Sequence, residues 1–440
     1  IMLSVITTLL GVGALIFAKH PALHSISLVS IIGILSAMVI AFTLQPLLFH
    51  LFIGSSKKRP ISLRVLINST ISLGYYSLGC VIFGLFAVTI LPIIPISKKL
   101  KMGWFHRSAS KFLKSVLYSN PFVVKKVIND TGEDFSKPGI IIANHTSSLD
   151  SLTIEMLYPN IIFLVNDWVF HSPIFGRAVR AAGFYPVSQG VENSFPHLRK
   201  KLDQGYSLMA FPEGTRSYTN KIKRFHKGAF HIAEQLDIDI IPVLIHGNSD
   251  VMPKGSLVIR DGGITVKILE RISATDQSFG KSSRQRTKNI SSHFKNEFDV
   301  FRREMEGPTY FHLMVLDDFR FKGDALYKTV RNDLNKYKEA YHNILNNVGK
   351  KDSIIHLSED CGQLDFLLLL DSADRKLFTY LADEIIRPII QNSYLANKYG
   401  RTMLVGTLNE ALDYPAQVLI INLKSLDLET WKEKIRNEIT

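Results

Sequence analysis

The chain has 440 residues, a formal net charge of +13 and a mean hydropathy of +0.11, with 21% charged residues. This length is more than one domain usually needs, and the positive hydropathy predicts apolar segments joined to ordinary globular ones. The basic excess suits a membrane surface, anionic lipids or nucleic acid. Cys80 and Cys361 lie far apart and outside any CxxC pattern, so neither a disulfide framework nor a zinc site is expected.

The N-terminal region has the composition of a membrane region. Residues 2–18 carry no charge, residues 26–54 are almost wholly apolar, and Lys-His-Pro at 19–21 separates the two runs. The first run is at the lower limit for a spanning helix and the second is ample. We therefore expect a transmembrane hairpin over 1–60, because a signal peptide would need a basic start and a small-residue cleavage site. The basic residues 57–59 predict that this end is cytoplasmic.

The segment HPALHSISLVSIIGILSAMVIAFTLQPLLF, residues 20–49, resembles the last two membrane helices of resistance–nodulation–division-type lipid exporters. The similarity lies in the His-Pro entry, the central glycine and the closing Leu-x-Pro. It implies that the chain, which starts with Ile1, begins inside a longer exporter-like polypeptide. Two helices cannot form a transport path alone, so no transport activity is expected.

A third apolar stretch, residues 67–97, has basic residues at both ends. Basic residues mark the cytoplasmic end of a spanning helix, so basic residues at both ends give no orientation for a single crossing. We expect membrane-associated or re-entrant helices over 61–118, bent near Gly74 or Gly84, and the alternative is a third spanning helix. Residues 104–114 combine aromatic residues with lysines, as is typical of an interfacial helix.

From residue 120 the pattern alternates between strands and helices, which predicts an α/β domain. Residues 139–143 form an apolar run typical of a buried strand. His145 follows at the strand's carboxyl end, where α/β sheets place their chemistry, and Asp150 comes five residues later. Imidazole titrates near pH ~6.5, and a carboxylate fixes its tautomer, so the pair can take a proton from an alcohol. The alternative is a helix cap, a role open also to Ser147 or Ser148.

A second polar segment follows the strand expected over 206–210. Residues 211–217, FPEGTRS, place an acid in a tight turn made by proline and glycine. Arg216 offers a planar donor fork that suits phosphate. The basic residues of 221–227 are further phosphate binders, or, for Lys221 and Lys223 in particular, part of a solvated loop.

NHTSSLD at 144–150 and FPEGTRS at 211–217 resemble the first and third blocks of the glycerolipid, 1-acylglycerol-3-phosphate-type acyltransferase family. FHKG at 225–228 and IIPV at 240–243 resemble its later blocks, so that the similarity covers about residues 100–275. The resemblance implies an acyltransferase domain over 119–275 that uses an acyl thioester of coenzyme A or acyl carrier protein.

The resemblance also implies roles for individual residues. His145 is the catalytic base and Asp150 orients it, while backbone N–H groups near the helix start meet the oxyanion. No cofactor and no metal are expected. The implied substrate-binding residues are Asn144, Glu213, Gly214, Thr215, Arg216 and Lys227. The second block departs from the family pattern, because Gln189 stands where arginine is expected. Lysophosphatidate is the default acceptor, and a lipid without phosphate is the alternative.

The C-terminal part changes character again. Residues 276–307 predict a helical linker, and 308–440 a small Rossmann-like α/β domain. We expect strands at 353–357, 376–380 and 417–422 and a helix at 363–371. SEDCGQ at 358–363 resembles the first turn of class I S-adenosylmethionine methyltransferases, but only Gly362 remains of the glycine-rich turn. A degenerate methyltransferase-like domain is expected, and an active methyltransferase is the alternative.

Together these patterns predict an α/β protein with N-terminal transmembrane helices, a central acyltransferase domain and a C-terminal Rossmann-like domain. The expected function is membrane-bound O-acyl transfer in phospholipid biosynthesis, at the cytoplasmic face of a bacterial-type inner (cytoplasmic) membrane. The expected partners are the membrane, acyl-CoA or acyl carrier protein, and a lysophospholipid or related acceptor. Nucleic acid is not expected, because no basic run is interleaved with aromatic residues. The alternative is the end of a lipid exporter fused to a domain acting on a phosphate-free lipid.

Overall fold

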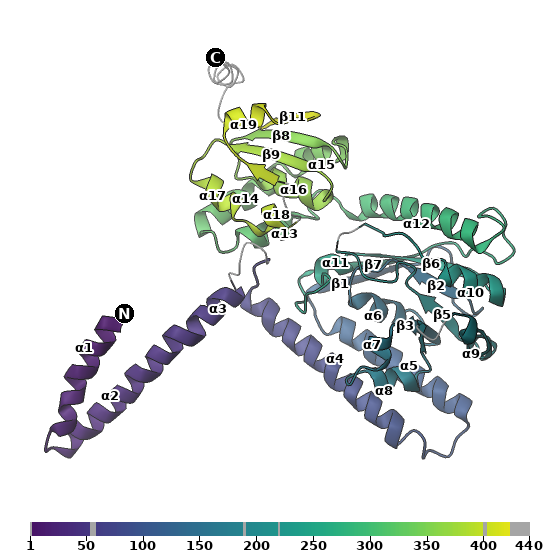
Figure 1. Ribbon diagram of the computed structural model, residues 1–440, viewed down its shortest axis with the longest axis horizontal. Coiled ribbons are helices and arrows are strands. Elements are labelled where there is room, and N and C mark those ends of the chain that lie inside the picture. Colours follow the sequence, from purple (N-terminus) through teal and green to yellow (C-terminus); the bar gives the residue numbers. More distant parts are fainter. Residues whose placement is uncertain (1, 53–58, 188–190, 219–220, 399–402, 423–440) are drawn as a thin grey trace. The chain divides into compact units, whose positions relative to one another are not determined.

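The computed structural model describes residues 2–52, 59–187, 191–218, 221–398 and 403–422 (Figure 1). The chain divides into two compact units. One unit comprises Leu63–Met305, and the other joins Ile1–Ser62 to Glu306–Thr440.

The unit Leu63–Met305 contains a seven-stranded sheet in the order β1-β7-β6-β2-β5-β3-β4. All neighbours pair in parallel except β6 and β7, so β1 and β7 run opposite to the other five strands. The strands are β1 Val123–Ile128, β2 Ile140–Ala143, β3 Ile161–Val165, β4 Tyr185–Pro186, β5 Ser207–Ala210, β6 Ile240–His246 and β7 Gly262–Ile268. The strands expected at 139–143, 206–210 and 240–243 are confirmed.

Helices cover both faces of this sheet. They are α5 Lys98–Tyr118, α6 Leu149–Glu155, α7 Asp167–Phe170, α8 Gly176–Ala181, α9 Val191–Asp203, α10 Gly228–Leu236, α11 Asn248–Val251 and α12 Ser283–Met305. Alternate residues of β2 belong to two different hydrophobic clusters: Ile140 and Ile142 to one, Ile141 and Ala143 to the other. A strand buried on both faces reads as a continuous apolar run, as β2 does.

Helix α12 is part of this core. Ile290, Phe294 and Phe301 are fully buried in the cluster that contains Ile140 and Ile142. Burial of each large side chain of this kind stabilises a fold by about 1.5–3 kcal/mol. The prediction of a helix within 276–307 is confirmed, but its description as a linker was wrong, because the helix closes one face of the sheet.

Helix α4, Leu63–Thr89, is a single unbroken helix. It passes through Gly74 and Gly84 without interruption, so the predicted bend at these glycines was wrong. Gly79 lies against the ring of Phe112 in α5, and Gly84 against Arg177 in α8, so small residues allow close packing on this face. Elsewhere α4 exposes large apolar side chains, among them Ile67, Ile71, Leu78, Ile82 and Leu85.

The N-terminal helices are α1 Met2–Gly13, η1 Ala14–Phe17, α2 Pro21–Val39, η2 Ile40–Leu44 and α3 Gln45–Phe52. The chain turns at residues 18–20, between the two predicted apolar runs, and Pro21 already begins α2. The Ser27 hydroxyl donates to the Val12 carbonyl at 2.6 Å, which joins α2 to α1. By length and composition, Pro21–Phe49 and Leu63–Thr89 are two helices able to cross a membrane, whereas Met2–Phe17 is shorter.

The C-terminal part of the other unit contains a parallel four-stranded sheet in the order β10-β9-β8-β11. Its strands are β8 Ser353–Ser358, β9 Lys376–Leu381, β10 Met403–Val405 and β11 Val418–Asn422. Its helices are α13 His312–Phe319, α14 Asp324–Lys336, α15 Lys338–Asn347, α16 Gln363–Asp371, α17 Ile386–Gln391, α18 Tyr394–Asn397 and α19 Leu408–Leu412. The three expected strands and the expected helix are present, β10 was missed, and the methyltransferase resemblance stays a prediction.

Candidate active site

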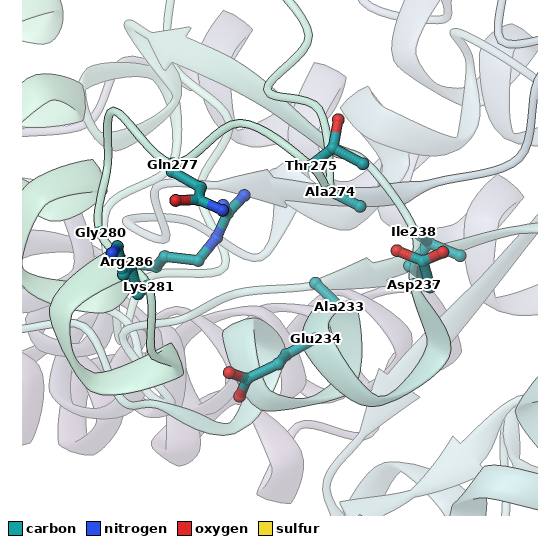
Figure 2. A pocket seen from close by; sticks show the side chains of 10 residues that line it. All are labelled: Ala233, Glu234, Asp237, Ile238, Ala274, Thr275, Gln277, Gly280, Lys281 and Arg286. Atoms are coloured by element: carbon teal, nitrogen blue, oxygen red, sulfur yellow. The ribbon is translucent and has the colours of Figure 1, made fainter.

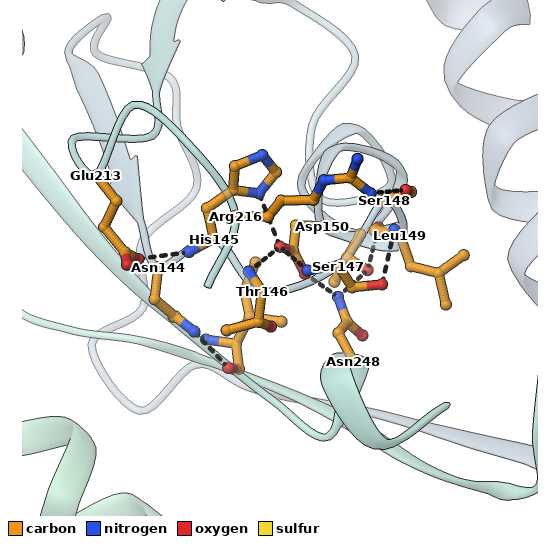
Figure 3. A network of polar contacts seen from close by, with 12 residues as sticks. Asn144, His145, Thr146, Ser147, Ser148, Leu149, Asp150, Glu213, Arg216 and Asn248 are labelled. Atoms are coloured by element: carbon orange, nitrogen blue, oxygen red, sulfur yellow. Dashed lines mark hydrogen bonds and ion pairs between the residues drawn. The ribbon is translucent and has the colours of Figure 1, made fainter. Parts of the chain in front are cut away.

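Three neighbouring strands of the seven-stranded sheet, β6, β2 and β5, end at the same edge, because they run parallel to one another. His145 follows β2 by two residues, Phe211 follows β5 directly, and Asn248 follows β6 by two residues. The sheet thus brings three separate polar loops together at one place (Figure 3).

His145 and Asp150 form a direct pair. The Nδ1 atom of His145 lies 2.9 Å from Oδ2 of Asp150, and the Asp150 side chain is fully buried while that of His145 is 19% exposed. With Nδ1–H donating to the carboxylate, the Nε2 atom is left with the basic lone pair. The Phe211 ring stacks on the imidazole with centroids 4.0 Å apart and planes inclined by 13°. The imidazole is therefore held by a carboxylate at one nitrogen and by an aromatic ring across its face.

Asp150, in the first turn of α6, accepts three further hydrogen bonds. The backbone N–H groups of Thr146 and Ser147 donate to Oδ2 at 2.7 and 2.8 Å, and the Asn248 amide donates to Oδ1 at 2.7 Å. An ionised carboxylate has acceptor positions for all four donors. This network, drawn in Figure 3, fixes the direction in which the carboxylate faces the imidazole.

Three backbone N–H groups of the loop before α6 already have acceptors. Those of Thr146 and Ser147 point at Asp150, and that of His145 donates to Oε1 of Glu213 at 2.7 Å. The prediction that N–H groups near the helix start meet an oxyanion was wrong for these three residues, because carboxylate oxygens take their hydrogen bonds.

Two predicted substrate-binding residues hold loops together instead. Glu213 is 2% exposed, and its second oxygen accepts from the Lys223 backbone N–H at 2.8 Å. Burial raises the pKa of Glu213, and the N–H donors of Lys223 and His145 act in the opposite direction. The fully buried Asn144 side chain exchanges two 2.8 Å hydrogen bonds with the backbone of Ile245 in β6. Both side chains are bound to backbone groups of neighbouring segments and stabilise the fold. The prediction that they line the acceptor site was therefore wrong.

The other predicted binding residues are open to solvent. Gly214, with φ of +69°, and Thr215 are exposed at the turn after β5. The Arg216 guanidinium donates to the Ser148 hydroxyl (Figure 3), and the next residue, Ser217, donates its N–H to the His145 carbonyl at 2.8 Å. Arg216 thus lies beside the His145–Asp150 pair.

Two further positions bear on the acceptor. Lys227 is exposed immediately before α10, and its contact with an acceptor stays a prediction. Gln189, where the resemblance expects arginine, lies outside the described residues.

Asn248 was missed from the sequence. It is fully buried, and besides Asp150 its amide reaches the Thr153 hydroxyl at 3.2 Å. Gly247, with φ of +87°, makes the turn that brings Asn248 under the carboxylate. The sequence does contain a signal for it, because Asn248 comes just after an apolar strand with the same pattern as the strand that precedes His145.

A cavity of about 260 Å³ lies elsewhere in this unit (Figure 2). It is lined by the end of α10, the segment 274–281 and Arg286. Because β6 begins just after the lining residue Ile238, the cavity is at the edge of the sheet opposite to His145. Arg286 is bound there to the carbonyls of Ser273 and Asp276. Within the described ranges, His, Cys, Asp and Glu side chains form no group of three that could hold a metal ion.

Comparison with known proteins gives a partial match. Residues 124–246 match the family model Acyltransferase. This region includes His145, Asp150 and 211–217, the blocks on which the resemblance was based.

Curated relatives agree with this match. The chain is 32% identical over 136 residues to the chloroplastic 1-acyl-sn-glycerol-3-phosphate acyltransferase LPAT1 of Arabidopsis thaliana, covering 30% of this chain and 38% of the relative. It is 30% identical over 167 residues to a 1-acyl-sn-glycerol-3-phosphate acyltransferase of Cocos nucifera, covering 36% and 52%. The chain thus spans about half or less of these relatives. The crystal structure of the 1-acyl-sn-glycerophosphate (LPA) acyltransferase PlsC of Thermotoga maritima aligns with a TM-score of 0.47 and 21% identity, over 54% of this chain and 97% of that one.

Proposed function

We propose that this chain is a membrane-bound O-acyltransferase that moves an acyl chain from an acyl thioester to the hydroxyl of a lysophospholipid. The observation that carries the proposal is the His145–Asp150 pair, with Nδ1 on the carboxylate and Nε2 left as the base. The position of Arg216 beside that base supports an acceptor that carries a phosphate. The relatives named above act, by their names, on 1-acyl-sn-glycerol 3-phosphate, which is the first acceptor to test.

The proposed reaction needs only groups of this chain and its two substrates. The acceptor hydroxyl gives its proton to Nε2 of His145 while its oxygen bonds to the thioester carbonyl carbon. The buried Asp150 carboxylate stabilises the imidazolium that forms. Collapse of the tetrahedral intermediate breaks the C–S bond, and the imidazolium returns the proton to the departing thiolate. The acyl ester and the free thiol are the products.

We also propose the setting of the reaction. Two helices have the length and composition to cross a membrane, and α4 exposes an apolar face, which suits a lipid acceptor that does not leave the bilayer. The donor is an acyl thioester of coenzyme A or acyl carrier protein, and the domain faces the cytoplasm from a bacterial-type inner membrane. The C-terminal sheet is proposed as a methyltransferase-like domain without activity. In its first turn, the buried Asp360 is engaged by the Gly362 N–H at 2.7 Å and the Asn422 amide at 2.9 Å.

The test is the transfer of a labelled acyl group by the full chain in membranes or detergent, with lysophosphatidate and other lysolipids as acceptors. His145→Ala should lower the rate by about 10²–10⁴-fold, the range that general-base catalysis supplies. His231→Ala is the matched control, because His231 is a partly exposed histidine of α10 in the same unit. Transfer by His145→Ala at the rate of this control would contradict the proposal.

A further inference from the structure

The backbone carbonyl of Arg216 binds two lysines from different parts of the chain. The Nζ atoms of Lys223 and Lys254 each lie 3.0 Å from this oxygen. Two ammonium groups on one oxygen repel each other, and a bound anion between them would remove that cost. Each ammonium has three donors, and the carbonyl takes only one of them. Both ammonium groups therefore keep donors with which an anion can be bound.

Lys254 is held in place by the catalytic loop itself. The Ser147 hydroxyl donates to the Met252 carbonyl at 2.6 Å, and Ser147 forms a β-bridge with Pro253, the residue before Lys254. The Nζ atom also lies 4.0 Å from the centre of the Tyr218 ring, a cation–π contact that holds the charge without neutralising it. The lysine is therefore directed to the Arg216 carbonyl from a turn anchored two residues after His145.

Three cations are gathered beside the base in this way. The guanidinium of Arg216 is on the Ser148 hydroxyl, and Ser217, next to the shared carbonyl, is bonded to the His145 backbone. A phosphate monoester carries nearly two negative charges and three acceptor oxygens, which matches one guanidinium and two ammonium groups.

We propose that Lys254, together with Arg216 and Lys223, binds the phosphate of the acceptor. This inference rests on the proposed function and adds a residue to it. Gln189 is neutral and cannot pair with a phosphate bidentately, so the sequence has one cation fewer than the resemblance expects. Lys254 supplies the missing charge from the turn after β6 rather than from the second block.

The experiment measures steady-state kinetics of the full chain with lysophosphatidate, monoacylglycerol and acyl-CoA as the varied substrates. Lys254→Ala should raise the KM for lysophosphatidate by about 10- to 100-fold, since a hydrogen bond to a charged group contributes about 1.5–3 kcal/mol. The KM for monoacylglycerol should change much less. Lys254→Gln should behave like Lys254→Ala, because its amide can still donate to the carbonyl but carries no charge. Lys126→Ala, an exposed lysine on the edge strand β1, is the matched control.

The outcomes distinguish a failure of the inference about Lys254 from a failure of the proposed function. If the wild type prefers lysophosphatidate to monoacylglycerol but Lys254→Ala has an unchanged KM, the inference is overturned and the proposed function stands. A normal KM in Lys254→Gln alone would overturn it too, because the role would then be the carbonyl hydrogen bond. A rise confined to the KM of acyl-CoA would assign the anion to the donor's phosphates. Equal use of lysophosphatidate and monoacylglycerol by the wild type would refute the phosphate acceptor itself, and Lys254 with it.

Discussion

Replacing Asp150 with asparagine removes the charge from the proposed catalytic pair while keeping almost all of the hydrogen bonds of the side chain. The remaining side-chain oxygen can still accept from His145 Nδ1 and from the two backbone N–H groups that now bind Oδ2. The new amide faces Asn248, whose Oδ1 atom is buried without a partner among the described residues. After rotation of the Asn248 amide, this oxygen can accept the new donor. The variant should therefore fold as the wild type does.

The expected loss is in kcat. In the proposed reaction, His145 becomes an imidazolium whose Nδ1 atom lies 2.9 Å from Oδ2 of Asp150, and the Asp150 side chain is fully buried. Loss of that charge should lower kcat by about 10²–10⁴-fold, equivalent to about 3–5 kcal/mol of barrier. The KM for the acceptor should change little, because the buried carboxylate contacts the imidazole rather than the substrate.

The assay is initial-rate acyl transfer with a thermal unfolding curve for each variant. If Asp150 only capped α6, asparagine would serve as well, and an unchanged kcat would refute the catalytic assignment. The double variant Asp150→Asn with Asn248→Asp restores the number of charges but places the carboxylate away from the imidazole. It should recover no activity. Recovery would mean that a charge anywhere in the loop suffices, contrary to the direct pairing.

Three further predictions concern stability and the C-terminal part. Burial raises the pKa of Glu155 in α6 from 4.5 to about 8, so the unfolded chain ionises first and the fold loses stability as pH rises between these values. Glu155→Gln should therefore stabilise the protein by roughly 3 kcal/mol at pH 7, and a melting-temperature gain that is equal at pH 5 and pH 8 would contradict this. Removing 306–440 should leave acyl transfer measurable, because each proposed catalytic or binding group precedes residue 255. Calorimetry of the full chain with S-adenosylmethionine should show no binding, and saturable heat or a lost transfer activity would speak against these expectations.

Local patterns in the sequence were enough for six of the eleven strands of the described residues and for the His145–Asp150 pair. An apolar run of four or five residues is recognisable without its neighbours, and so is a histidine at its end with an acid five residues later. His145 and Asp150 are close in the chain, so the strand–turn–helix between them determines their distance. The turn that carries Arg216 is recognisable for a similar reason, whereas the position of that turn near His145 depends on β5 lying next to β2.

Contacts between distant segments could not be predicted in this way. Asn248 reaches Asp150, and Lys254 reaches the Arg216 carbonyl, only because β6 lies next to β2 and β2 next to β5 in the sheet. No local sequence pattern predicts this order of the strands in the sheet. The same limit explains α12, whose apolar face has the period of any amphipathic helix and whose place on the sheet depends on the core that it covers. The same limit explains why the role of Glu213 could not be predicted. This buried side chain joins two loops, because the N–H groups that donate to its two oxygens belong to residues 68 and 10 positions away in the chain.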